Sequence, residues 1–551
     1  MSDQPAEILS EEKATTFDEG NPVLRGLIAA GGAGITLFIV STMLFYPLPA
    51  MMQRAGVLML SLFIIFMQYP LFPKKKALAW IDWLWAALSI VVCAYVLWDF
   101  EDLVNRMGDM NDIDKIFGTL CVVMVLDATR RAIGWPLPIV TGLFLLYAYF
   151  GNQISGSFGH RGYDVHRILN QMYMTTEGVF GIPLGVVVTI VFLFILFGTF
   201  LERSGGGQFF INLAVSLAGR LRGGPAKIAV IASGLMGMIS GSSIANVATV
   251  GTFTIPLMKR VGYRAEFAGA VESAAATGGQ IMPPVLGAAA FIMSEFTHTP
   301  YLTIVVLSIV PAILYYLSLF MNVHFEACRT GLEGMPEEEI PKTSKVLAEG
   351  WIFILPVITL VVVLTMGFSP ARAAFSAMGL LIVLSLLKAS TRIGPTVFWE
   401  SLVAAGRNTV GIAAACACAG IIVGTVSMTG LGIKFANLIE QISQGHLLFA
   451  LMFTAVASLV LGMALPTTAN YIVQASVAAP ALVALGLPVT VADVLCALAG
   501  SNSGPDSDGK GVSEFIRVGF NIEFSRIEHD SFANIGKRPT VDRCLSKESG
   551  Y

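Results

Sequence analysis

The stretch Gly-Met-Ile-Ser-Gly-Ser-Ser-Ile-Ala-Asn, residues 237–246, is nearly repeated by Gly-Met-Ala-Leu-Pro-Thr-Thr-Ala-Asn, residues 462–470. Both copies follow an apolar run, bend at Gly241 or Pro466, and present two hydroxyl side chains before Ala-Asn. The first copy separates the apolar runs Ala226–Ile239 and Val247–Met258. At about 1.5 Å per residue, each run is roughly 20 Å long, shorter than the hydrocarbon core of about 30 Å. The pattern therefore predicts a re-entrant helical hairpin.

A re-entrant hairpin in a membrane protein indicates a possible binding site. Irregular backbone at membrane depth occurs only inside protein or beside a water-filled cavity. A pair of broken apolar segments in two parts of a chain is typical of a transporter's binding site. The alternative is two ordinary helices whose small residues allow close packing. Because the motif occurs twice, we favour a binding site over simple helix packing.

Composition indicates the class of protein. The chain has 551 residues, of which 55% are hydrophobic and 13% charged, whereas soluble domains have about 25% charged residues. We therefore predict an all-α polytopic membrane protein whose surroundings are a lipid bilayer. The net charge of −3 gives no case for nucleic acid, and the seven cysteines have no metal-binding or redox spacing. Residues 1–20 are acidic, do not resemble a cleaved signal peptide, and are predicted to be a disordered tail.

Long apolar runs predict the membrane spans. The predicted spans are Val23–Tyr46, Ala55–Phe72, Leu78–Trp98, Gly118–Trp135, Pro138–Phe150, Pro183–Leu201, Tyr301–Val323, Trp351–Gly367, Ala371–Leu387 and Thr409–Val426. The arms of the second hairpin are predicted at Leu447–Leu461 and Tyr471–Leu487. We also expect Asp127 to form an ion pair with Arg130 and Arg131, since unpaired charges are costly in a bilayer.

A second kind of break follows the first hairpin. The helix predicted at Ala265–Thr277 ends in Gly-Gly-Gln-Ile-Met-Pro-Pro, residues 278–284. Paired glycines free the backbone and paired prolines remove two N–H donors, which leaves carbonyl oxygens suited to a small, hard cation. A plain proline kink without a ligand is the alternative. Glu272 in this helix could carry a proton, although we expect it to pair with Arg264.

These motifs resemble the membrane component of the tripartite ATP-independent periplasmic (TRAP) transporters, in the variety that fuses the small and large membrane subunits. The resemblance covers roughly residues 20–495. The matching stretches are Gly-Gly-Pro-Ala-Lys at 223–227, Ser-Gly-Ser at 240–242 continuing to Asn246, Gly-Thr at 251–252, Ile-Pro at 255–256, residues 278–284, and Leu-Pro-Thr-Thr-Ala-Asn at 465–470.

The resemblance implies an organisation and a function. Residues 21–135 would be a small-subunit-like four-helix membrane region, and residues 136–500 a large-subunit-like transport domain. The family's fold implies inverted repeats with re-entrant helical hairpins in an elevator-type transporter of the bacterial inner membrane. It also implies sodium as the coupling ion with no other cofactor, a small organic anion such as a carboxylate as substrate, and a periplasmic substrate-binding protein as partner. No catalytic residues are expected.

The same resemblance assigns candidate sodium ligands by position. The candidates beside the first hairpin are Ser242, Ser243, Asn246, Gly279 and Gln280. The candidates beside the second hairpin are Thr467, Thr468 and Asn470. Helix N-termini at the hairpin tips would face an anionic substrate with N–H donors.

Other functional classes make different demands on the sequence. A passive channel would share the hairpins, and only a carrier would show trans-stimulation in counterflow. An intramembrane serine hydrolase would use Ser242 or Ser243, but it needs a histidine base, and the six histidines lie mostly in loops or at span ends. An ATP-driven pump is disfavoured because no Gly-x-x-x-x-Gly-Lys-[Ser/Thr] motif occurs.

The sequence departs from the family pattern after the second hairpin. A counterpart of residues 278–284 is expected there, but the chain becomes polar after Gly500. We therefore expect the second repeat to be incomplete, residues 501–551 to be a tail foreign to the family, and the chain to be defective in transport through C-terminal truncation or a frameshift.

Overall fold

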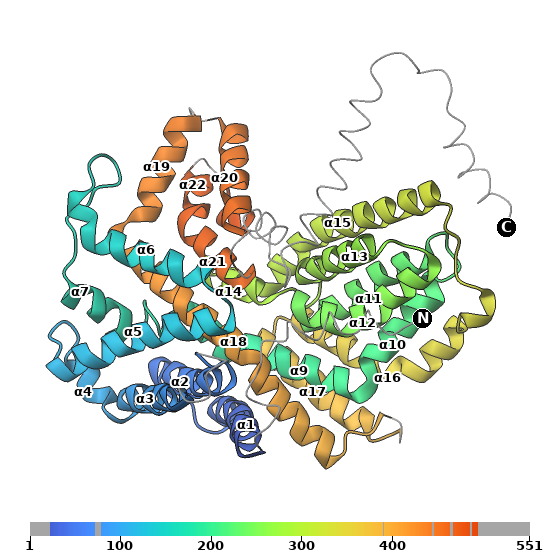
Figure 1. Cartoon of the computed structure of the whole chain (residues 1–551), viewed down its shortest axis with the longest axis horizontal. Coiled ribbons are helices and arrows are strands. Elements are labelled where there is room, and N and C mark those ends of the chain that lie inside the picture. Colours follow the sequence, from blue (N-terminus) through green and yellow to red (C-terminus); the bar gives the residue numbers. More distant parts are fainter. Residues whose placement is uncertain are drawn as a thin grey trace. The chain divides into compact units, whose positions relative to one another are not determined.

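The computed structural model describes residues 22–71, 79–388, 391–443, 446–462, 465, 467–484 and 487–493. These residues form helices joined by short connections, with no strand among them (Figure 1). The predicted tails at 1–20 and 501–551 lie outside the described residues.

The helices up to the first hairpin are α1 (Pro22–Leu44), α2 (Ala50–Gln68), α3 (Ala79–Trp98), α4 (Phe100–Asn105), α5 (Asp112–Ala132), α6 (Pro136–Phe150), η3 (Gly151–Gln153), α7 (Val165–Leu169), η4 (Asn170–Met174), α8 (Ile182–Val186), η5 (Val187–Val191), α9 (Phe192–Leu201), η6 (Glu202–Gly206) and α10 (Gly207–Ala218). The helices from the first hairpin to the charged loop are α11 (Gly224–Ser240), α12 (Ser243–Val261), α13 (Ala265–Gly278), η7 (Gly279–Ile281), α14 (Ala288–Thr297), α15 (Tyr301–Thr330) and η8 (Glu337–Glu339). The remainder are α16 (Thr343–Thr365), α17 (Pro370–Ser385), α18 (Pro395–Thr429), α19 (Leu431–Ser443), α20 (Leu447–Gly462), α21 (Thr467–Val477) and α22 (Ala479–Ala484).

Seven helical stretches in the described part of the chain are long and apolar enough to cross a membrane. They are Pro22–Leu44, Ala50–Gln68, Ala79–Trp98, Ile182–Ala218, Tyr301–Thr330, Glu337–Thr365 and Pro395–Thr429. This result confirms the prediction of an all-α polytopic membrane protein.

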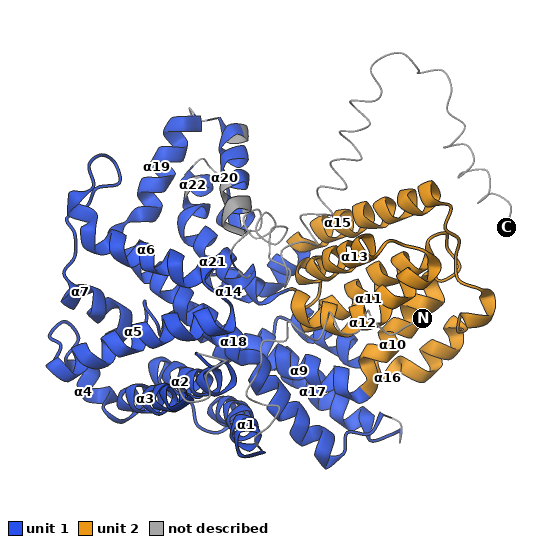
Figure 2. Ribbon diagram, in the orientation of Figure 1, with its two compact units in different colours: residues 1–204, 287–306, 355–504 blue, residues 205–286, 307–354, 505–551 orange. Residues whose placement is uncertain are grey.

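The described chain forms two compact units (Figure 2). Unit 1 contains the residues up to Ser204, the segment Gly287–Val306, and the described residues from Leu355 onward. Unit 2 contains Gly205–Leu286 and Leu307–Ile354. The second hairpin therefore belongs to unit 1, and the first hairpin belongs to unit 2.

Helix α18 is the centre of unit 1, where it packs against α1, α2, α5, α6, α8, α9 and α21. It is 35 residues long, far longer than the predicted span Thr409–Val426. Small residues allow the close packing: a Cβ at Gly406 would lie 2.0 Å from the carbonyl oxygen of Gly32 in α1. The Thr36 hydroxyl also donates to the carbonyl oxygen of Leu402 at 2.7 Å. Close backbone contact thus joins α1 to the long helix.

A buried ion-pair network joins α3 and α5 of unit 1 and reaches the residue that follows α2. As predicted, Asp127 accepts hydrogen bonds from Arg130, at 2.6 Å, and from Arg131, at 2.8 Å. The Arg131 guanidinium also contacts Asp82 of α3 and donates to the carbonyl oxygen of Tyr69 at 3.1 Å. The side chains of Arg131 and Asp82 are only 3% and 7% exposed. The charges of α3 and α5 therefore compensate each other away from solvent.

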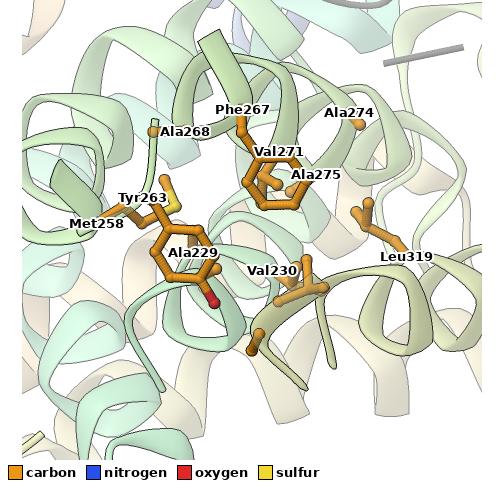
Figure 3. Close-up of a cluster of buried hydrophobic side chains, with 13 residues drawn as sticks. Ala229, Val230, Met258, Tyr263, Phe267, Ala268, Val271, Ala274, Ala275 and Leu319 are labelled. Atoms are coloured by element: carbon orange, nitrogen blue, oxygen red, sulfur yellow. The ribbon is translucent and has the colours of Figure 1, made fainter. Parts of the chain in front are cut away.

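Unit 2 is built around the first hairpin and the helix that follows it. Helices α11, α12 and α13 pack pairwise against one another. Alanines on α11 and α13 let the backbones approach, and the Tyr263 and Phe267 rings stack with centroids 5.5 Å apart (Figure 3). From α15, Leu319, Val323 and Ala327 complete this buried cluster.

Helix α15 has two different faces. The face with Leu319, Val323 and Ala327 is buried against α11 and α13. The opposite face exposes a stripe of large apolar side chains, namely Val310, Ile313, Leu314, Leu317, Met321 and Phe325. In a membrane-spanning helix such a stripe contacts lipid tails.

The hairpin arms differ from their predicted lengths. Helices α11 and α12 have 17 and 19 residues, so at 1.5 Å per residue they extend about 26 and 28 Å, close to the thickness of the hydrocarbon core. The prediction missed the helix start at Gly224, where Pro225 favours initiation. The second arm of the second hairpin was predicted as one helix but is divided into α21 and α22. Pro480 causes this division because it has no N–H for the carbonyl oxygen of Ser476.

Candidate functional site

The first hairpin turns within two residues. Gly241 ends α11 with φ of +60°, a left-handed conformation that favours glycine. Ser242 then adopts an extended conformation, and its hydroxyl accepts a hydrogen bond from the Ala245 N–H at 3.4 Å. Ser242 is therefore the N-cap of α12, which explains why a hydroxyl follows the glycine.

The break after α13 lies directly against the first hairpin. A Cβ added at Gly237 of α11 would lie 2.4 Å from the Cα of Gly279, and the reverse addition gives 2.5 Å. Only glycine at both positions permits this approach of two backbones. From the same break, the Gln280 amide donates to the Ser243 hydroxyl at 2.9 Å. Three helix ends therefore meet: the end of α11, the start of α12 and the end of α13.

Asn246 lies at this meeting point with an acceptor that has no partner. The residue is 1% exposed, and its Nδ2 donates to the carbonyl oxygen of Ser233 at 2.8 Å. Its Oδ1 is buried without any hydrogen-bond partner. Leaving a buried acceptor unsatisfied costs about 1–3 kcal/mol, so folding alone does not explain it. A cation ligated by Oδ1 would remove that cost.

The structure thus brings together four of the five candidates predicted for the first site. Ser243 and Gln280 are hydrogen-bonded, and a Cβ at Gly279 would lie 3.5 Å from Asn246 Nδ2. The fifth, Ser242, adjoins Ser243 and caps α12. All the side-chain groups are hydroxyls or amides, and no group of three His, Cys, Asp or Glu residues suited to a metal occurs in the described chain. Such neutral oxygens suit an alkali cation better than a transition metal.

The second copy of the hairpin motif resembles the first only in part. Thr467 and Thr468 are half-buried at the start of α21, and Asn470 is fully buried. Asn470 Oδ1 accepts from the Gln474 amide at 2.7 Å, while its Nδ2 has no partner. Pro466, the predicted bend, lies outside the described residues.

The two copies also share a hydrogen bond between a serine carbonyl and an amide side chain. Ser233 and Ser458 each precede the Gly-Met pair by four residues. The carbonyl oxygen of Ser233 accepts from Asn246, and that of Ser458 accepts from Gln474 at 3.4 Å. Both serine carbonyls therefore hold an amide of the following arm. Buried polar atoms without hydrogen-bond partners remain around the second copy, on Thr454, Ser458, Asn470 and Gln474.

The predicted ion pair between Glu272 and Arg264 is wrong. Its carboxyl group is bonded by the Ser233 hydroxyl at 2.5 Å and by the Thr254 hydroxyl, and not by Arg264. Arg264 is the exposed N-cap residue of α13, two turns away from Glu272. Ser233 and Thr254 were not among the predicted site residues. Their apolar neighbours in α11 and α12 give no local signal, although each faces α13 once the helices pack.

Comparison with known proteins decides the family. Residues 120–504 match the family described as "Tripartite ATP-independent periplasmic transporter, DctM component". The chain belongs to the DctM family. Relatives include the C4-dicarboxylate TRAP transporter large permease protein of Pseudomonas aeruginosa, 32% identical over 33% of this chain and 42% of that protein. Another is the isethionate TRAP transporter permease protein of Oleidesulfovibrio alaskensis, 26% identical over 47% of this chain and 41% of that protein.

Other similarities are more distant. The sialic acid permease of Vibrio cholerae is 26% identical over 33% of this chain and 42% of that protein. The chain thus spans about two fifths of the length of these relatives. A solved structure, the Alcanivorax borkumensis YdaH transporter, has a TM-score of 0.46 and 16% identity, covering 73% of this chain and 92% of that one. Membership of the DctM family makes the chain a transporter permease component, not a hydrolase.

Asn246 and Ser242 are candidate sodium ligands of this DctM-family chain. We expect Asn246→Ala or Ser242→Ala to weaken sodium binding by about 1–3 kcal/mol, because a dehydrated cation loses an oxygen ligand. That cost corresponds to roughly a 5- to 150-fold rise in the dissociation constant. Isothermal titration with sodium chloride measures it, and the thermal midpoint of the sodium-free protein reports folding. Unchanged sodium affinity in both variants would support simple helix packing instead.

Proposed function

We propose that the chain is the membrane permease of a sodium-coupled import system for a small organic anion such as a carboxylate. It would act in the bacterial inner membrane as an elevator-type carrier with inverted repeats, and a periplasmic substrate-binding protein would deliver the substrate. The observation that carries the proposal is the buried, unpartnered Oδ1 of Asn246 at the meeting point of three helix ends. Sodium would be the coupling ion, with no other cofactor.

The polarity of the helix ends supports both ligands. The last turns of α11 and α13 present carbonyl oxygens and the negative ends of their dipoles, which attract a cation. The first turn of α12 presents N–H groups and a positive end, which attract an anion. Relatives named for C4-dicarboxylate, isethionate and sialic acid are in keeping with an organic anion as cargo. A cation and an anion can therefore bind next to each other.

The same geometry supports a role for the second copy. Thr467, Thr468 and Asn470 would supply hydroxyl and amide oxygens to a second sodium ion. Thr454, Ser458 and Gln474 contribute further buried polar atoms that lack partners.

Uptake by proteoliposomes tests the proposed coupling. Any accumulation of substrate is expected to require both an inward sodium gradient and a cognate binding protein. Choline replacing sodium on both sides is the control, and Asn246→Ala should raise the sodium concentration needed for half-maximal uptake. Unchanged uptake in choline would contradict sodium coupling. Efficient uptake without the binding protein would contradict the delivery step, and absence of trans-stimulation in counterflow would indicate a channel.

A further inference from the structure

Glu272 is a carboxyl group enclosed in the centre of unit 2. It is fully buried on α13, facing α11 and α12. The Ser233 hydroxyl of α11 donates to Oε1 at 2.5 Å, and the Thr254 hydroxyl of α12 contacts Oε2. These two hydroxyls are its hydrogen-bond partners, and no ion pair with Glu272 occurs in the described part of the chain. An ionised carboxylate in such a place is costly, since it needs a paired charge or several donors.

The available hydrogens favour the neutral acid. A threonine hydroxyl has one hydrogen to donate, and the Thr254 Oγ1 also lies 3.0 Å from the carbonyl oxygen of Val250. If Glu272 were ionised, Thr254 could donate to only one of these two acceptors. If Glu272 is protonated, its Oε2–H donates to Thr254, Thr254 donates to Val250, and Ser233 donates to Oε1. Each of the three contacts then has its own hydrogen.

Charged groups on the surrounding elements have other partners or lie elsewhere. On α13 itself, Glu266 is exposed. On α11, the Lys227 ammonium lies 3.1 Å from His324 Nδ1 of α15 and over the Phe320 ring. The remaining titratable groups on the packed elements are Lys259 and Arg260 at the end of α12, Tyr301 at the start of α15, Tyr315 and Tyr316 of α15, and Glu326, Cys328 and Arg329 at its end. Tyr315 and Tyr316 donate to carbonyl oxygens of α13. None of them bonds Glu272, so no cation in the described part of unit 2 holds its charge.

Ser233 links Glu272 to the candidate sodium site. Its hydroxyl bonds Glu272, while its carbonyl oxygen accepts the Asn246 amide. The two groups are therefore held by one residue of α11. A cation at Asn246 Oδ1 would act through this low-dielectric interior, where the interaction between charges is strong. Its positive charge would favour the ionised form of Glu272 over the neutral form.

We propose that Glu272 is a proton-binding site, and that a cation binding at Asn246 displaces its proton. In this exchange the Oε2–H bond breaks, its electron pair stays on the carboxylate, and the proton leaves to water. The cation's charge replaces the proton's charge, so the charge of the buried unit is unchanged. The displacement rests on the proposed sodium site, whereas proton binding by Glu272 stands without it.

Infrared spectroscopy of the full chain in nanodiscs tests the proton site alone. We expect a protonated-carboxyl band at neutral pH that disappears on alkalinisation and is absent from Glu272→Gln. Glutamine can accept from Ser233 and donate to Thr254, so this variant should fold. Glu266→Gln, a change at the exposed carboxyl of the same helix, should leave the band unchanged. A neutral-pH spectrum identical in wild type and Glu272→Gln would overturn the proposal.

Proton release on adding sodium tests the displacement. In weakly buffered solution we expect sodium chloride, but not choline chloride, to release protons from the wild type. Glu272→Gln should bind sodium without releasing protons. Reciprocity requires wild-type sodium affinity to rise with pH, by up to about tenfold per unit for one exchanged proton, and to become flat in Glu272→Gln. Sodium binding without release would overturn the displacement. Absence of sodium binding would overturn it together with the sodium site, while the infrared band would still decide whether Glu272 carries a proton.

Discussion

Replacing Gly279 with alanine is expected to destabilise unit 2 and to weaken binding at the proposed sodium site. The new Cβ would lie 2.5 Å from the Cα of Gly237, and both atoms belong to main chains that cannot rotate away. Helix α13 must then move from α11, at a cost of about 1–3 kcal/mol or more. The same movement would carry Gln280 away from Ser243, so we expect at least a tenfold loss of sodium affinity. Gly237→Ala should have the same two effects, because its Cβ would lie 2.4 Å from the Cα of Gly279.

Gly269 provides the matched control. It lies in α13, and a Cβ there would meet no atom within 4 Å. Alanine in a helix interior is favoured over glycine by about 0.5–1 kcal/mol, so Gly269→Ala should be neutral or stabilising. Thermal unfolding and sodium titration of the three variants measure both effects. If Gly279→Ala behaved like Gly269→Ala, the close contact of α11 with α13 would be wrong.

Removal of the Asp82 carboxylate is expected to cause the largest loss of stability in unit 1. Asp82→Ala would take away one of the two carboxylates that hold the buried Arg131, and also the acceptor of the Leu71 N–H at 3.1 Å. Breaking one side of a buried ion pair typically costs about 3–5 kcal/mol. We expect a correspondingly lower midpoint of thermal unfolding in detergent.

Two further variants distinguish the buried pair from general charge effects. Asp112 pairs with Lys115, but its side chain is 93% exposed, so Asp112→Ala should leave the midpoint of thermal unfolding nearly unchanged. In Asp82→Ala/Arg131→Met the buried guanidinium that has lost one of its two carboxylates is removed as well, so part of the lost stability should return. A double variant as unstable as the sum of its single variants would show that Asp82 and Arg131 act independently.

The sequence predicted features that depend on local chemistry. Apolar runs gave most spans, the glycine and proline pairs gave the end of α13, and the hydroxyls after Gly241 gave the start of α12. It could not give features set by distant helices. The length of α18 was underestimated because Arg407 and Asn408, in its fourth turn, break the apolar run.

The partners of Glu272 show the same limit at the candidate site. A nearby arginine in the sequence was an attractive partner, but helix geometry places Arg264 two turns away. Hydroxyls from two other helices take its place, and only the packing of α11 and α12 against α13 brings them there. The contact between Gly237 and Gly279 likewise depends on two backbones 42 residues apart in the sequence.

The two faces of α15 imply two regimes of mutational tolerance. Lipid tails are fluid and adapt to any apolar shape, so exchanges among Leu, Ile, Val, Met and Phe at Val310, Ile313 or Leu317 should be nearly neutral. The face with Val323 and Ala327 meets fixed neighbours, where even one added methylene is resisted. Natural variants of this helix should therefore show a permissive stripe beside a restricted one. Saturation mutagenesis read out by cellular abundance would reveal the orientation of α15 without a structure.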